Sequence, residues 1–339
     1  MPFHLREPWR EQYFPDITCL TAVDIPADDR EAFTRNPRHR WIYNRLLIAQ
    51  SQGLPCGPHD VGPTRFPVFC TAVTNFDGRE SGGRVLWSER DYLEQCGAGN
   101  FWMELPAGDH VSTDFAVVAG EIAWCRHASG IWGSAGSYDY WVVEEGTRPR
   151  LERFCATWIR MNLAGYTGMV NLETVGGRIS TARLRFSGQW PDLYGRRWLA
   201  SIVRLHQYGT WDLIDTERAE GYSLNLTGTH DSGSAYPPAD SMRAYEETVG
   251  VSCIQLPFFD EDPAGAQGAT AAQGATEGRG RAAAQERRAN GFRLAVINCF
   301  NLEVGIRVRT NLAREFGLPV ESYGRRTSPA NRSARSLRV

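Results

Sequence analysis

A chain of 339 residues that is 42% hydrophobic can bury a large core, either as several small domains or as one composite catalytic unit. Its formal net charge of −2 is nearly balanced, which argues against a nucleic-acid partner or an electrostatic membrane contact. All 37 basic residues are arginine, so catalysis by a lysine amine is excluded, whereas clamping of phosphates by guanidinium groups is not.

The segment Met1–Glu11 carries charged residues and no apolar core, so we expect no secretory signal. No apolar run approaches the roughly 20 residues of a membrane-spanning helix, and we therefore expect a cytoplasmic protein without a membrane partner. The 8 cysteines are scattered and none forms a C-x-x-C pair. This pattern argues against a zinc site and favours free thiols.

The first part of the chain predicts an irregular lead-in followed by a small α+β unit. Residues 1–40 are rich in Pro, Asp and Arg and form the lead-in. Apolar residues at helical spacing predict a helix over Trp41–Gln52, which Gly53 and Pro55 terminate. We then expect a strand, a glycine-rich loop, a short strand, a helix capped by Ser88 and a further strand, over Phe66–Val73, Asp77–Gly83, Arg84–Trp87, Ser88–Gln95 and Phe101–Leu105.

The middle of the chain predicts antiparallel strands and two helices. The patterns favour two strands, a helix, a hairpin turning at Gly176-Gly177 and a second helix, over Val111–Val118, Ile122–Arg126, Arg150–Leu163, Met169–Phe186 and Trp198–Tyr208. The aromatic segment Gln189–Gly195, together with Trp198 and Trp211, is expected to pack as a core. His127 is expected either to face a binding site or to be a surface feature at a strand end.

The end of the chain divides by composition. Residues 261–290 are low-complexity Ala, Gly, Gln and Arg, which predicts a disordered insertion. A closing unit over 291–320 is expected to hold a strand, Phe292–Asn298, and a helix, Leu302–Phe316. The basic, serine-rich residues 321–339 predict a disordered tail.

The order of these pieces resembles the ATP-grasp superfamily over Arg40–Gly195. The resemblance is carried by Gly53-Leu54-Pro55 before a strand that begins Pro67-Val68, by a glycine-rich loop, and by the segments GDHVSTDFAVVAGEIAWCRH, GYTGMVNLETVGG and LRFSGQWPDLYG. It implies an α+β fold in which two α+β subdomains, 41–105 and 106–260, clamp a nucleotide between antiparallel sheets. It also implies ATP and Mg²⁺ as cofactors.

The resemblance implies roles for particular residues. The loop over the phosphates matches Gly82, Gly83 and Arg84, because glycines let backbone N–H groups approach anionic oxygens and Arg84 adds a charged fork. The adenine hinge and the ribose contacts match Met103, Glu104, Leu105, Asp109 and His110. Glu173 matches a magnesium ligand and Arg185 an arginine that steadies the transferred phosphoryl group. The alternatives are a surface turn for the glycines, a satisfied surface histidine for His110 and a salt bridge for Arg185.

The departures from the family pattern concern the same sites. Thr71 stands where the family has a lysine on the phosphates, and Thr181 where it has a second carboxylate. Arg183 stands in place of the third metal ligand. A single glutamate beside an arginine would bind Mg²⁺ poorly, so Arg183 could instead take over the charge of the metal or of the lysine.

Two functions follow from the resemblance. The first is an ATP-dependent carboxylate–amine ligase that acts on a small-molecule carboxylate through an acylphosphate, with Arg183 and Arg185 as catalytic residues. The second is a catalytically degenerate relative that binds a nucleotide and serves a regulatory or interaction role. An unrelated α+β protein is the third alternative. The resemblance also implies a homodimer.

Overall fold

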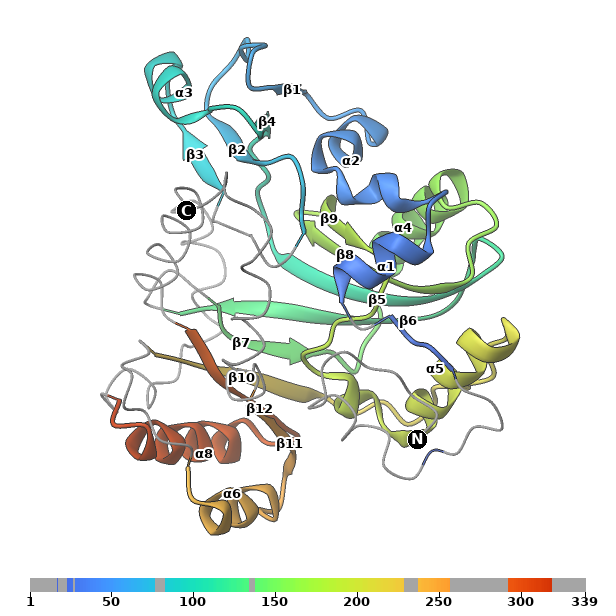
Figure 1. Ribbon diagram of the computed structural model, residues 1–339, viewed down its shortest axis with the longest axis vertical. Coiled ribbons are helices and arrows are strands. Elements are labelled where there is room, and N and C mark those ends of the chain that lie inside the picture. Colours follow the sequence, from blue (N-terminus) through green and yellow to red (C-terminus); the bar gives the residue numbers. More distant parts are fainter. Residues whose placement is uncertain are drawn as a thin grey trace, which may run out of the picture.

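The computed structural model describes residues 17, 23–26, 28–76, 83–133, 138–228, 237–256 and 292–318. These residues form two antiparallel sheets, one of 4 strands in the order β1-β4-β2-β3 and one of 8 strands in the order β11-β12-β10-β7-β6-β5-β8-β9. In Figure 1 the smaller sheet lies above the end of the larger sheet that β5, β8 and β9 form. The expectations for 77–82, for the insertion 261–290 and for the tail 321–339 fall outside the described residues.

The smaller sheet is built almost as its sequence predicts. It comprises β1, β2, β3 and β4, over Cys56–Pro58, Val68–Ala72, Arg84–Leu86 and Asn100–Glu104. Helix α2 (Arg45–Ser51) contributes Ala49 to a core with Phe101 and Met103. Helix α3 (Glu89–Gln95) begins as expected at Ser88, whose side chain accepts a hydrogen bond from the Asp91 amide.

The larger sheet runs through most of the remaining chain. Its strands are β5 (His110–Val118), β6 (Glu121–Trp132), β7 (Tyr138–Val143), β8 (Gly168–Val175), β9 (Arg178–Arg183), β10 (Gly221–Gly228), β11 (Val251–Gln255) and β12 (Phe292–Cys299). Side chains alternate between the faces along each strand. We call the face that carries Ser112, Asp114, Asn171 and Glu173 the front face, and the opposite face the back face.

Helices and single turns cover both faces. On the back face, α4 (Pro149–Asn162) packs Trp158 and Ile159 against Phe115 and Leu172. On the front face, η3 (Pro191–Tyr194) and α5 (Arg196–Tyr208) form an aromatic core that includes Trp198, as the sequence predicts. The remaining elements are α1, η2, α6 and α8, over Asp29–Arg35, Arg40–Tyr43, Ala239–Glu246 and Leu302–Glu315.

One hairpin turn and one helix start show why particular residues are required. The β8–β9 hairpin turns at Gly176 and Gly177, as predicted, with φ of 56° and 79°. A Cβ on Gly176 would lie 1.9 Å from the Ala107 carbonyl oxygen, so no other residue fits there. The prediction of an irregular lead-in over residues 1–40 is wrong for α1, which begins where the Asp28 side chain accepts a hydrogen bond from the Glu31 amide.

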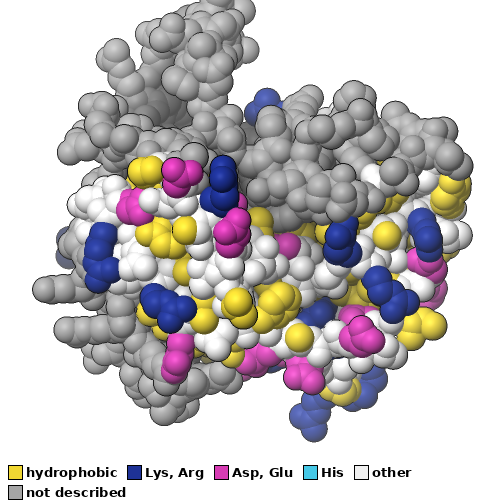
Figure 2. All heavy atoms as spheres, turned by 90° about the horizontal axis from the view of Figure 1, so that it is seen from below, with side chains coloured by type: hydrophobic (Ala, Val, Ile, Leu, Met, Phe, Trp, Pro, Cys, Tyr) yellow, Lys and Arg dark blue, Asp and Glu magenta, His cyan; other side chains and the backbone are white. Residues whose placement is uncertain are grey.

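The surface seen from below Figure 1 mixes its side-chain types. Figure 2 shows acidic, basic and hydrophobic side chains interspersed over the described part of that face, with no broad patch of one charge. No helix in the described ranges is long and apolar enough to cross a membrane.

Candidate functional site

Glu173 lies in the middle of β8 on the front face, opposite Ser112 of β5 and Thr181 of β9. Its side chain is 18% exposed and has a nitrogen near each oxygen. Arg183 Nη1 donates to Oε1 at 2.5 Å, and His110 Nε2 lies 3.3 Å from Oε2. Burial raises the pKa of Glu173, but the Arg183 charge and His110 outweigh burial and hold this pKa well below its usual range. The carboxylate is therefore an ionised, paired group.

A second carboxylate, from α1, extends the network. Asp29 receives two hydrogen bonds from Arg185, Nε to Oδ1 at 2.8 Å and Nη2 to Oδ2 at 2.9 Å. Arg183 Nε lies 3.6 Å from Asp29 Oδ2, and Arg183 Nη1 also donates to Asn171 Oδ1 at 3.3 Å. The two arginines and the two carboxylates thus compensate one another. For Arg185, this is the salt bridge that we considered as the alternative to a phosphoryl contact.

Asp114 lies beside this network and is 1% exposed. It accepts hydrogen bonds from Asn171 Nδ2 at 2.8 Å, from the Ser187 amide at 2.9 Å and from the Tyr194 hydroxyl at 2.9 Å. Burial raises its pKa to about 6, although these three donors oppose the shift. Asn171 Nδ2 also donates to Ser112 Oγ at 2.9 Å, so the network continues across β5.

The smaller sheet carries the other expected site residues. Arg84 is exposed and opens β3 opposite Cys70, while Gly83 lies against Phe69, whose ring would meet a Cβ at 2.0 Å. At the end of β4, Met103 is buried and Glu104 is exposed. The Glu104 amide donates to the Pro55 carbonyl at 2.8 Å. Gly82 lies outside the described residues.

A buried arginine lies beside Thr71, the position for which the resemblance implies a lysine in the family. Arg45 Nη1, from α2, donates to Thr71 Oγ1 at 3.0 Å, and the two residues are 6% and 8% exposed. A guanidinium therefore supplies positive charge near this position of β2. The sequence pattern gave no reason to select Arg45, because it belongs to a helix predicted only from apolar spacing.

Comparisons with known proteins bear on the fold. No protein-family model and no curated protein sequence matches the chain. Among solved structures, N5-carboxyaminoimidazole ribonucleotide synthetase from Thermus thermophilus is similar with a TM-score of 0.54 and 14% identity, over 93% of this chain and 86% of that chain. The chain has the ATP-grasp fold.

Two further ATP-grasp structures agree with this result. The L-amino acid ligase from Bacillus licheniformis has a TM-score of 0.51 and 10% identity, over 84% of this chain and 72% of that chain. The carboxyaminoimidazole ribonucleotide synthase from Aspergillus clavatus, solved in complex with ATP, has a TM-score of 0.52 and 11% identity, over 82% and 74%. At these identities the likeness establishes the ATP-grasp fold and not an activity.

The residues around Glu173 do not fit the Mg²⁺ that the ATP-grasp family implies. A hard divalent cation needs oxygen ligands with uncompensated negative charge. Here the Arg183 guanidinium lies 2.5 Å from one carboxylate oxygen, His110 lies beside the other, and Thr181 stands across the strand pair. The positive charge beside Glu173 is therefore already supplied by Arg183.

The ATP-grasp fold brings some of the expected residues together and keeps others apart. His110, Glu173, Arg183 and Arg185 belong to one front-face network. Asp109, beside them in sequence, is exposed, and its carbonyl accepts a hydrogen bond from the Gly176 amide at 3.0 Å. The loop residues Gly83 and Arg84 and the hinge residues Met103, Glu104 and Leu105 lie in or beside the smaller sheet.

Sequence reasoning missed Asp29 and Asp114 as members of the site. Asp29 lies in the segment expected to be irregular, and nothing local marks it. Asp114 could have been found, because a carboxylate within the apolar run of β5 costs free energy unless it is hydrogen-bonded. The same argument applies to Glu173, which we selected from the resemblance.

Proposed function

We propose that this protein binds ATP between its two sheets and that arginine side chains, rather than a Mg²⁺ ion on Glu173, provide the positive charge. The observation that carries the proposal is the 2.5 Å contact between Arg183 Nη1 and Glu173 Oε1. The ATP-grasp fold and the ATP found in the Aspergillus clavatus enzyme support the choice of nucleotide. In this proposal the protein is a nucleotide-binding relative of the ligases, with a regulatory or interaction role.

Arg45 supports the same proposal from the smaller sheet. By resemblance, ATP-grasp proteins hold the ATP phosphates with a lysine at the position of Thr71, and a threonine carries no positive charge. The Arg45 guanidinium lies 3.0 Å from the Thr71 hydroxyl and stays protonated at any physiological pH. An arginine can also offer two parallel N–H groups to a phosphate, which a lysine cannot. Arg84, exposed at the start of β3, adds a third guanidinium for the phosphates.

The second candidate is ATP-dependent carboxylate–amine ligation, which the names of the similar ligase and synthetases favour. The carboxylate oxygen of a small acid would attack the γ-phosphorus of ATP and release ADP. An amine would then displace phosphate from the acylphosphate and form an amide. Arg185 would stabilise the phosphoryl group only if it left Asp29, to which it donates two hydrogen bonds. The ion pairs Arg183–Glu173 and Arg185–Asp29 therefore both weigh against catalytic turnover.

Calorimetry of the full-length protein with ATP, in EDTA and in Mg²⁺, tests the proposal. We expect binding in both conditions, with dissociation constants that agree to within about threefold, and a loss of at least about tenfold in affinity for Arg45→Met. Arg160→Gln is the matched control, since Arg160 pairs with Glu121 on the surface. Binding that requires Mg²⁺, with ADP release when carboxylic acids and amines are added, would favour the ligase. Absence of ATP binding in both conditions contradicts both candidates.

A further inference from the structure

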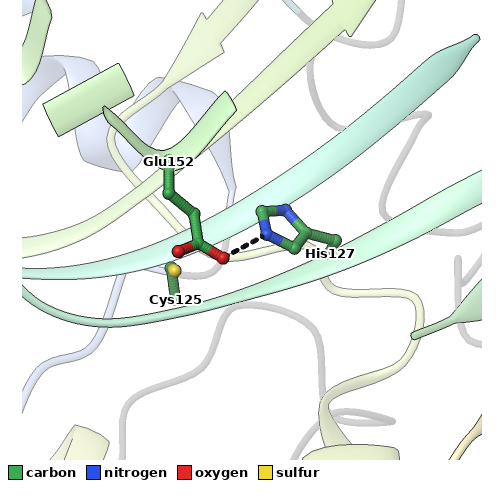
Figure 3. A group of neighbouring side chains, drawn as sticks. All are labelled: Cys125, His127 and Glu152. Atoms are coloured by element: carbon green, nitrogen blue, oxygen red, sulfur yellow. Dashed lines mark hydrogen bonds and ion pairs between the residues drawn. The ribbon is translucent and has the colours of Figure 1, made fainter. Parts of the chain in front are cut away.

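Three side chains with metal-ligating atoms meet on the back face of the larger sheet. Cys125 and His127 are two residues apart on β6 and therefore point to the same side. Glu152 reaches them from the first turns of α4 (Figure 3). One ligand atom from each of the three lies within 4.8 Å of the others. We propose that Cys125, His127 and Glu152 bind a Zn²⁺ ion.

His127 is already oriented for this role. It is fully buried, so the prediction of a surface feature at a strand end is wrong. Its Nδ1 is 2.9 Å from Thr113 Oγ1, and its Nε2 is 3.0 Å from Glu152 Oε1. A ligating histidine usually hydrogen-bonds through the ring nitrogen that does not touch the metal. The Thr113 hydroxyl can accept from Nδ1–H as readily as it can donate to Nδ1, and the first arrangement leaves Nε2 unprotonated for the ion.

Glu152 is also held in position by its own helix. Its Oε1 accepts a hydrogen bond from the Arg148 amide at 2.9 Å, at the start of α4. The Glu152 side chain is 27% exposed and Cys125 is half-buried, so solvent reaches the cluster from this side. An ion could enter there, and a water molecule could complete its coordination.

The chemistry of the three ligands selects Zn²⁺ over Mg²⁺. A thiolate and an imidazole are soft or borderline donors, and three protein ligands with one open position are a common zinc arrangement. The thiolate and the carboxylate together carry two negative charges, which one Zn²⁺ neutralises. Binding releases the Cys125 thiol proton to solvent and breaks the hydrogen bond between His127 Nε2 and Glu152. His127 then carries its single proton on Nδ1, where the Thr113 hydroxyl accepts the hydrogen bond.

The alternative of a cysteine nucleophile fits the geometry less well. A nucleophilic thiol needs a base within hydrogen-bond reach. Both nitrogens of His127 already face other groups, Thr113 and Glu152. Burial, with the Glu152 charge adding to it, raises the pKa of the Cys125 thiol to about 12, so the thiol is not activated without a metal.

The proposed zinc site is separate from the ATP site. Neighbouring residues of β6 alternate, so Arg126 points to the front face opposite Asp114, while Cys125 and His127 point to the back face under α4. The two proposals therefore stand or fall independently, and a protein that does not bind ATP still tests the zinc site.

The test uses the full-length protein, stripped of metal with a chelator and titrated with Zn²⁺ against a competing chromophoric chelator. We expect one zinc ion per chain, bound roughly 100-fold more weakly or lost in Cys125→Ser and in Glu152→Gln. Glu152→Gln keeps a side-chain oxygen that can accept the hydrogen bond from the Arg148 amide, so the N-terminus of α4 should stay intact. Cys56→Ser is the matched control, because Cys56 is also half-buried but lies in the smaller sheet.

Cobalt provides a second readout that does not depend on affinity. Co²⁺ bound by a thiolate gives a sulfur-to-metal charge-transfer absorption in the near ultraviolet. We expect this band in the wild-type protein and in Cys56→Ser, and its loss in Cys125→Ser. Failure of the wild-type protein to bind Zn²⁺, or binding that Cys125→Ser leaves unchanged, overturns the proposal.

Discussion

The front and back faces of the same strands stabilise their buried polar groups in different ways. On the front face, the carboxylates of Glu173 and Asp29 are neutralised by guanidinium groups of Arg183 and Arg185. On the back face, the polar cluster is held through a histidine, His127, between a hydroxyl and a carboxylate. The comparison shows that a carboxylate in a sheet is not by itself evidence for a metal. On this face, guanidinium groups compensate the carboxylates.

Removing the guanidinium from the front face should have the largest effect. Arg183→Met leaves the largely buried Glu173 carboxylate without its main compensating charge, and we expect a loss of about 3–5 kcal/mol in the free energy of unfolding. Urea denaturation measures this loss. The double variant Glu173→Met/Arg183→Met should recover most of the stability, because the charge and its partner leave together. A single variant as stable as the wild-type protein would contradict the pairing.

The back face should respond through metal affinity rather than through stability. Thr113→Val removes the hydroxyl that meets His127 Nδ1, and we expect Zn²⁺ affinity to fall about 10–100-fold. Competition titration measures the change. Ser112→Ala, in the same strand but on the front face, serves as the control and should leave zinc affinity unchanged. Equal effects of the two substitutions would show that the faces are not chemically separate.

Two carboxylates of the front face should titrate with opposite consequences. The lowered pKa of Glu173 adds stability above its usual pKa of 4.5, and this stability is lost as the pH falls. Asp114 has a pKa raised to about 6 from 3.8, so its contribution is present at low pH and is lost as the pH rises through this range. We expect Glu173→Gln to reduce the loss of stability on acidification and Asp114→Asn to increase it. Urea midpoints between about pH 3 and pH 7 measure both changes of stability with pH.

An exposed pair should show the smallest effect. Glu121 and Arg160 are joined by two hydrogen bonds of 2.7 and 2.8 Å, yet their side chains are 61% and 60% exposed. Solvent screens such a pair, so Glu121→Gln should leave the urea midpoint unchanged within error. A clear drop in the urea midpoint would mean that the exposed Arg160–Glu121 pair also stabilises the protein. Burial would then not explain the larger effect expected for the Arg183–Glu173 pair.

Local sequence patterns predicted much of the fold. The Ser88 cap, the hairpin glycines and the apolar spacing of α4 and α5 depend on nearby residues, and the structure has all of these elements. The strands β1, β7, β10 and β11 were not predicted. Strands β10 and β11 carry polar residues and pair only with strands that are distant in the sequence, whereas β7 lies between the adjacent β6 and the distant β10.

The candidate site was predictable only in part. Glu173 could be selected from the resemblance, and Arg183 was named beside it, which the structure shows as an ion pair. Asp29 and Arg45 could not be selected, since their partners Arg185 and Thr71 are 156 and 26 residues away. The absence of C-x-x-C pairs argued against zinc, but it says nothing of a ligand that a helix brings from elsewhere.

The sequence by itself indicated many of the helices and strands, the use of arginine as the only strongly basic residue, and the departures from the ATP-grasp pattern. Only the tertiary structure decided which charges are compensated. The register of β8 and β9 puts Arg183 opposite Asn171, from where its side chain reaches Glu173. The packing of α4 puts Glu152 beside His127. The physical reason is that caps, turns and amphipathic spacing are short-range. Pairing of buried charges depends instead on distances across the sheet that no local pattern encodes.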